Sequence, residues 1–225
     1  MSTVSSPIIS PSTTRASALT RALSAAPELW VAGIAFAVYP ALRPFSDEIS
    51  RSGAQAFASP RWIIAHTFGI AAFTLLGLGL FRLTETLSLH RGRARSGLAL
   101  AWIGIGLTLP YYGAEVFGLH AAGQQALATG RITQFDNLIH NIRWEAGLWY
   151  ILAGLLALAT GTIILTTAAW REIPHPRLTL LPLTVAVTLY IPQFAAPQPV
   201  RVAHGLLLTA GCILLTVGIA GRRRA

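Results

Sequence analysis

The stretch LPYYGAEVFGLHAAG, residues 109–123, places a carboxylate and an imidazole at the end of a long apolar run. An ionisable group at the centre of a membrane helix costs about 2.5–3.5 kcal/mol on insertion scales, and such groups usually face a bundle interior and serve a function. Glu115 is therefore the first candidate catalytic residue. Tyr111 and Tyr112 precede it by four and three residues, so a regular helix would bring both close to it. His120, five residues later, would face elsewhere on the helix.

Other ionisable residues stand near the starts of apolar runs, and we expect them at the same end of one helix bundle. Glu145 follows Arg143, and His66 and His204 each occupy an Ala-His step. The sequence predicts four catalytic residues facing the bundle interior at a common depth: Glu115, Glu145, His66 and His204. The predicted substrate-binding residues are Tyr111, Tyr112, Trp62, Trp149, Phe117 and His120. Because neighbouring helical residues diverge by about 100°, only one of the two tyrosines should line a cavity with Glu115.

Carboxyl groups in an apolar pocket with aromatic walls suit the acid-initiated cyclisation of a prenyl chain. Desolvation favours a neutral carboxyl group, which can then act as a general acid. Aromatic faces stabilise the resulting cation, and a histidine or a second carboxylate can remove the final proton. The sequence predicts Glu115 as the proton donor, with Glu145 or a nearby histidine as its partner or the terminal base. We expect no metal ion and no other cofactor in such a mechanism.

The elements that must position these residues are membrane helices. The chain has 225 residues, of which 53% are hydrophobic and 11% charged, whereas soluble domains carry about 25% charged residues. Its mean hydropathy is +0.58, and several apolar runs approach the ~20 residues that cross a bilayer. We predict an all-α integral membrane protein, a single bundle of about six transmembrane helices near 27–43, 62–82, 97–119, 144–169, 178–195 and 202–220. A short interfacial helix near 131–141 could be miscounted as a seventh.

The basic residues are all arginines, and they stand between the apolar runs and at the chain ends. This is the positive-inside pattern of a membrane protein, so we expect the lipid bilayer and no nucleic acid as a partner. Eleven arginines fall on the side of the termini and six on the other. The sequence predicts a multi-pass protein of the cell membrane with cytoplasmic N- and C-termini. Its parts are a disordered tail over 1–24, a transmembrane domain over 25–221 and a basic end over 222–225.

Three stretches carry a resemblance to known proteins: ASPRWIIAHTFG, LTLPYYGAEVFGLHAAG and YIPQFAAPQPVRVAHGLLL. They resemble a broad group of small actinobacterial polytopic membrane proteins, mostly without assigned function. In size, span count and embedded acids, the chain is also similar to the bacterial membrane-bound terpene cyclases that close indole sesquiterpenes of the drimentine type. The second resemblance implies an isoprenoid-cyclising enzyme of secondary metabolism. Its partner would be a hydrophobic prenylated small molecule, such as a farnesylated indole.

Two other classes of function stay open at this point. A haem- or metal-binding redox protein could use imidazoles on separate helices as ligands, and the candidates are His66, His120, His140 and His204. A small-solute transporter or proton relay could use the same carboxylates and imidazoles, although the spans contain no clear inverted repeat. The oligomeric state is also open.

Overall fold

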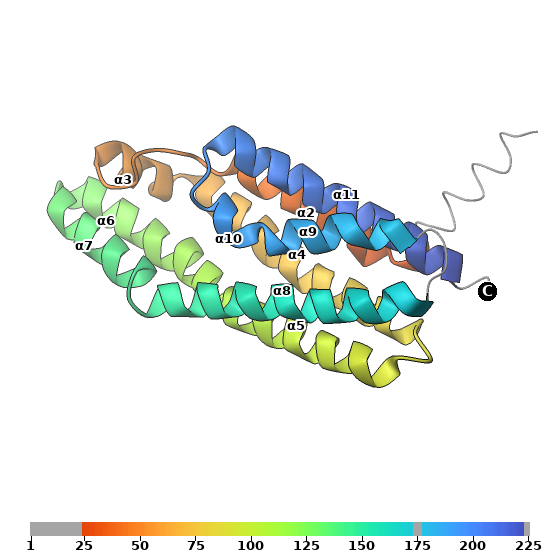
Figure 1. Ribbon diagram of the computed structural model, residues 1–225. Coiled ribbons are helices and arrows are strands. Elements are labelled where there is room, and N and C mark those ends of the chain that lie inside the picture. Colours follow the sequence, from red (N-terminus) through yellow and green to blue (C-terminus); the bar gives the residue numbers. More distant parts are fainter. Residues whose placement is uncertain (1–23, 173–176, 223–225) are drawn as a thin grey trace, which may run out of the picture.

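The computed structural model describes residues 24–172 and 177–222, and all the regular structure in these residues is helical (Figure 1). The predicted tail, except for Ser24, and residues 223–225 of the predicted basic end lie outside the described residues. The elements are α2 (Pro27–Leu42), α3 (Arg51–Ala58), α4 (Pro60–Glu85), α5 (Arg91–Gly113), the π-helix η1 (Ala114–Leu119), α6 (His120–Thr129), α7 (Ile132–Arg143), α8 (Ala146–Glu172), the 3-10 helix η2 (Arg177–Leu180), α9 (Leu181–Thr188), α10 (Tyr190–Gln193) and α11 (Gln198–Arg222).

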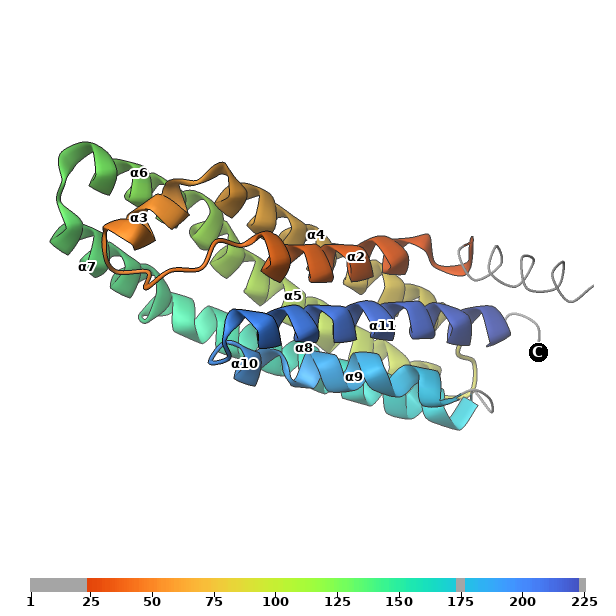
Figure 2. The ribbon, with the colours of Figure 1, turned by 90° about the horizontal axis from the view of Figure 1, so that it is seen from above.

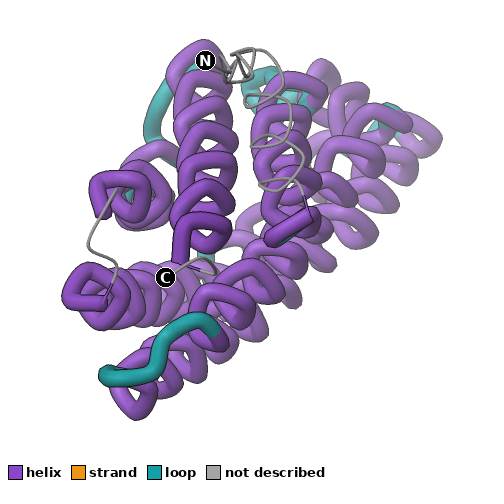
Figure 3. The backbone as a smooth tube through the Cα atoms, turned by 90° about the vertical axis from the view of Figure 1, so that its right-hand side faces the viewer, coloured by secondary structure: helices purple, strands orange, loops and turns teal. Residues whose placement is uncertain are grey.

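Six helices pack side by side in a ring, seen from one end in Figure 3. The order around the ring is α2, α4, α5, α8, α9 and α11, which returns to α2. The start of α2 and the end of α11 lie at the same end of the ring (Figure 1). The chain therefore runs an even number of times along the bundle.

Four helical segments are long and apolar enough to cross a membrane, judged by length and composition: Pro60–Glu85, Arg91–Thr129, Ile132–Glu172 and Gln198–Gly221. The chain is thus consistent with an all-α, multi-pass membrane protein. The predicted count of six spans is not confirmed, because the first and fifth apolar runs form only the shorter helices Pro27–Leu42 and Leu178–Thr188. The first helix ends before the Arg43-Pro44 step, and the fifth run is interrupted at Leu189, between α9 and α10.

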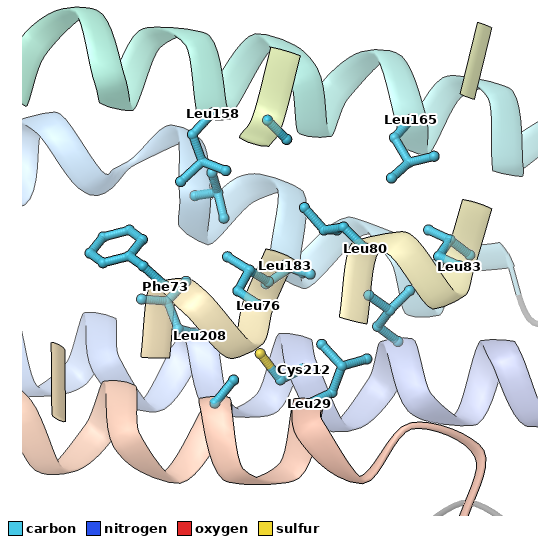
Figure 4. Packing of buried hydrophobic residues seen from close by; sticks show 14 of the residues in the cluster. Leu29, Phe73, Leu76, Leu80, Leu83, Leu158, Leu165, Leu183, Leu208 and Cys212 are labelled. Atoms are coloured by element: carbon cyan, nitrogen blue, oxygen red, sulfur yellow. The ribbon is translucent and has the colours of Figure 1, made fainter. Parts of the chain in front are cut away.

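The interior of the ring is apolar along most of its length. Figure 4 shows large side chains from opposite helices meeting there, and Cys212 is buried among them. Along one side, α5 and α8 touch backbone to backbone. A Cβ atom on Gly104 would lie 2.3 Å from the Leu158 nitrogen, and one on Gly161 would lie 2.4 Å from the Ala101 nitrogen. Small residues at such contacts are typical of membrane helix pairs.

A second apolar cluster stands apart from this interior. It joins α3, α6 and α7 to the start of α4 and consists of Ala54, Phe57, Trp62, Leu119, Ala122, Ala126, Phe135 and Ile139. The continuous helix Arg91–Thr129 has 39 residues, which is about 58 Å at ~1.5 Å per residue and nearly twice the ~30 Å hydrocarbon core of a bilayer. We call α3, α6 and α7 the cap, because they extend past one end of the ring (Figure 2). A short helix does occur near the predicted residues 131–141, as α7.

Candidate functional site

Glu115 lies where the ring meets the cap, on the π-helix η1. Short π segments inside α-helices occur frequently at functional sites. The indole N–H of Trp62 donates a hydrogen bond to the main-chain carbonyl of Glu115, with the two atoms 2.6 Å apart. Trp62 is fully buried, so its ring ties α4 to the π segment and holds Glu115 in place.

The carboxylate of Glu115 forms a two-pronged salt bridge with an arginine at the end of α7. Arg143 donates from Nε to Oε1 over 2.6 Å and from Nη2 to Oε2 over 2.9 Å. Its third nitrogen, Nη1, bonds Glu48, and the other oxygen of Glu48 accepts from Arg43 over 2.6 Å. The four side chains therefore alternate in sign, and we call them the ion-pair chain: Glu115, Arg143, Glu48 and Arg43.

This arrangement corrects the expectation that Glu115 stands as a neutral acid ready to donate a proton. A two-pronged bond from a guanidinium favours the ionised carboxylate and offsets the cost of its burial. On its other side, His66 Nε2 lies 3.5 Å from Oε2 of Glu115, while His66 Nδ1 is 2.8 Å from the Trp62 carbonyl oxygen. The prediction considered burial alone, whereas the decisive partner comes from a helix 28 residues away.

Glu48 lies outside the long helices, between α2 and α3, and its carboxylate is partly exposed. Burial alone would raise the pKa of this carboxyl group. The neighbouring charges of Arg43 and Arg143 outweigh that effect and hold the pKa of Glu48 below its usual value. Glu48 is thus a stable anion that links the two arginines.

A cavity of about 260 Å³ lies against the ion-pair chain. Its walls combine three kinds of side chain. The charged ones are Arg43, Glu48, Glu115, Arg143 and Arg201; the aromatic ones are Tyr39, Tyr111, Trp144 and Phe194; the aliphatic ones are Leu148, Ile151, Leu152, Leu155 and Ile191. The cavity therefore offers charged groups and a larger apolar surface to the same occupant.

The four predicted catalytic residues do not all meet at this cavity. Glu115 lines it, and His66 is buried directly behind Glu115. His204 lines a much smaller neighbouring pocket, and its Nε2 is 2.7 Å from the Ala186 carbonyl oxygen. The prediction that Glu145 faces the interior is wrong, since this residue is exposed. The reason is a break between α7 and α8, which turns the side chain outwards where regular helix was expected.

Of the predicted substrate-binding residues, only one lines the cavity. Tyr111 lines the cavity, whereas Tyr112 is fully buried with its hydroxyl 3.1 Å from that of Tyr190. The expected difference between the two tyrosines is thus confirmed. Trp149 and Phe117 are 71% and 70% exposed, as in an aromatic belt at the level of the lipid head groups.

Trp62 does not line the cavity, and His120 belongs to the cap as the first residue of α6. The Nδ1 atom of His120 is 2.7 Å from the Phe57 carbonyl oxygen. His140, one of the possible metal ligands, is exposed. Across residues 24–172 and 177–222, no three or more histidine, cysteine or carboxylate side chains form a group that could hold a metal ion.

Four charged residues of the cavity were not among the predicted site residues: Arg43, Glu48, Arg143 and Arg201. Each follows or precedes an apolar run, and charges in such places usually stay at the membrane surface. A usable signal for Arg43 and Glu48 was the opposite charge of these two residues within the short stretch 43–48, next to a proline. No family model, no curated protein and no solved structure matches the chain.

Proposed function

We propose that the chain is a six-span membrane protein with cytoplasmic termini that binds a small amphiphile, taken from the bilayer, in the 260 Å³ cavity. The observation that carries the proposal is the combination of charged and aliphatic side chains in the wall of one cavity. In this proposal α2 and the α9–α10 segment are the two short spans that complete the ring. The excess of arginines on the side of the termini supports the orientation.

The size and position of the cavity favour a single-chain ligand. Ligand pockets usually measure about 300–1,000 Å³, so a cavity of about 260 Å³ suits one short chain better than a two-chain phospholipid. Trp144 lines the cavity and is 60% exposed, and Trp149 and Tyr150 near the start of α8 are exposed as well. Tryptophan and tyrosine collect at the head-group level of a bilayer. The opening would then lie where the polar end of an amphiphile resides.

The test is direct binding of tritiated farnesol to the purified protein in nanodiscs. Leu152→Trp should fill the aliphatic part of the cavity and weaken binding by about tenfold or more, since a tenfold change needs only ~1.4 kcal/mol. Leu156→Trp is the matched control, because Leu156 lies one turn further along α8 and is exposed. Equal affinities of the two variants, or no saturable binding by the unchanged protein, would contradict the proposal.

A second candidate function is the cyclisation of a prenylated small molecule, the reaction implied by the resemblance to membrane-bound terpene cyclases. One observation favours it: Glu48, Glu115 and four aromatic side chains line the same cavity. Arg143 would have to release Glu115 when substrate binds, or Glu115 would act as the base that takes the final proton. In membranes supplied with a farnesylated indole, Glu115→Gln should lower turnover at least ~100-fold, the lower end for general acid–base catalysis. Full turnover by this variant would exclude the candidate.

A further inference from the structure

Arg43 has a hydrogen-bonding capacity that the protein does not use. Its Nη2 atom bonds Glu48, but its Nη1 atom is buried and has no hydrogen-bond partner among residues 24–172 and 177–222. The guanidinium carbon lies 4.8 Å from the ring centres of both Phe45 and Trp62, so the group is held in place by packing. Buried donors without a partner are rare, and each requires an explanation. Because Arg43 lines the cavity, a ligand could supply the missing acceptor.

Arg201 places a second positive charge in the cavity wall, close to the same phenylalanine ring as Arg43. Its guanidinium carbon lies 5.2 Å from the centre of the Phe45 ring, against which Arg43 also packs. Arg201 donates to the carbonyl oxygens of Ala196 and Phe194. Within the described residues it makes no salt bridge to a carboxylate. Its charge is therefore not neutralised by a direct partner.

The charges around the cavity do not cancel, since three arginines face two glutamates. Arg143 uses all three of its nitrogens on Glu115 and Glu48. The excess positive charge thus belongs to Arg43 and Arg201. Arg201 also lies in the first turn of α11, where the helix dipole favours an anion.

We propose that Arg43 and Arg201 bind the anionic head group, a carboxylate or a phosphate, of the amphiphile whose chain occupies the cavity. The inference rests on the proposed function, because it requires an amphiphile in the cavity. Guanidinium groups match the geometry of both anions and bind them through charge-assisted hydrogen bonds. An anion between the two arginines would accept from the free Nη1 of Arg43 and relieve the repulsion between the like charges. The class of ligand is then an anionic single-chain lipid, not a neutral one.

Three probes with the same chain test this inference: farnesol, farnesoate and farnesyl monophosphate. The anionic probe that fits should bind about tenfold or more tightly than farnesol at low salt, given the typical strength of a charge-assisted hydrogen bond. The two anions distinguish a carboxylate head group from a phosphate. If farnesol binds as tightly as both anions, the head-group inference fails while the proposed function stands. If none of the three binds, the proposed function itself fails.

Variants of Arg201 separate its charge from its bonds to the loop carbonyls. Arg201→Gln should bring farnesol and the preferred anion to similar affinities, whereas Arg201→Lys should keep most of the preference. A purely structural role would make both variants lose binding of all three probes equally. Arg131→Gln is the matched control, since Arg131 is exposed on the cap, and it should change nothing. Arg43→Gln, scored only if its thermal unfolding stays cooperative, should reduce the preference as Arg201→Gln does; an unchanged preference in either glutamine variant would contradict the inference.

Discussion

Two glutamates at opposite ends of the bundle are almost equally buried, yet their surroundings give them different tasks. Glu115 is 4% exposed and Glu172 is 5% exposed. Glu172, at the end of α8, accepts main-chain N–H groups of Ser88 over 2.8 Å and His90 over 2.5 Å. Glu115 accepts from the side chain of Arg143, which is shared with Glu48 beside a cavity.

The difference shows that burial alone does not identify a functional acid. Main-chain donors cannot leave a carboxylate without the unfolding of the segment that carries them, so Glu172 fixes the connection between α4 and α5. A guanidinium shared by two acids can exchange partners when a ligand arrives, because its five N–H groups sit on a long side chain. The charges beside the cavity can therefore rearrange around an occupant, whereas Glu172 at the opposite end holds a fixed connection between two helices.

The largest effect should come from Arg143→Gln, which leaves Glu115 and Glu48 without their shared partner. Breaking a buried ion pair by removing one member typically costs about 3–5 kcal/mol. We expect a fall in the free energy of unfolding of this order, measured by denaturant unfolding in detergent. The double variant Glu115→Gln/Arg143→Gln should recover part of the loss, because no uncompensated charge then remains at that pair. A double variant as unstable as the sum of the single ones would show that the two residues act independently.

A smaller and local effect should follow from Glu172→Gln. A hydrogen bond to a charged group contributes about 1.5–3 kcal/mol, and the amide oxygen of glutamine replaces only one of the two charged acceptors. Hydrogen exchange at the Ser88 and His90 amides should become faster, while ligand binding at the far cavity stays unchanged. Loss of ligand binding in this variant would contradict the claim that Glu172 has only a local structural role.

The pH dependence of stability should distinguish Glu48 from a simple surface acid. Its pKa is lower in the folded protein than the ordinary value of 4.5. Its contribution is therefore fully present above about pH 4.5 and is lost as the pH falls through the lower folded value. The difference in melting temperature between the unchanged protein and Glu48→Gln should shrink as the pH is lowered from 6 towards 3. A constant difference across this range would show that the two arginines do not stabilise the anion.

The smallest effect should come from Glu145→Gln. Glu145 is exposed in the break between α7 and α8, and surface substitutions usually change stability by less than about 0.5 kcal/mol. Unfolding, probe binding and any turnover of a farnesylated indole should match those of the unchanged protein. The same measurements on Glu115→Gln provide the comparison, because Glu115 lines the cavity and Glu145 does not. A strong loss of probe binding or turnover in Glu145→Gln would instead indicate that Glu115 and Glu145 form one site.

The sequence was sufficient for the general character of the helices and for some members of the site. Apolar runs of nearly bilayer length predicted the long helices, because helix length and composition are local properties. The cost of burying a charge identified Glu115, and the angular period of a helix separated Tyr111 from Tyr112. The same period failed for Glu145, because the turn after Arg143 interrupts the helix.

Other features depended on which segments meet in space. The sequence around Glu115 does not show that its partner is Arg143, which is 28 residues away, and Glu48 lies 95 residues from the same arginine. Only the contact between Arg43 and Glu48 is local, within the connection between α2 and α3. The charge state of Glu115 follows from the contact with Arg143. The length of the apolar runs and the types of the candidate side chains could thus be predicted from the sequence, since they depend only on single residues and their neighbours. The cavity, the pairing of its charges and the unused donor of Arg43 were decided by the tertiary structure, because electrostatic energy in a buried site depends on distances between segments.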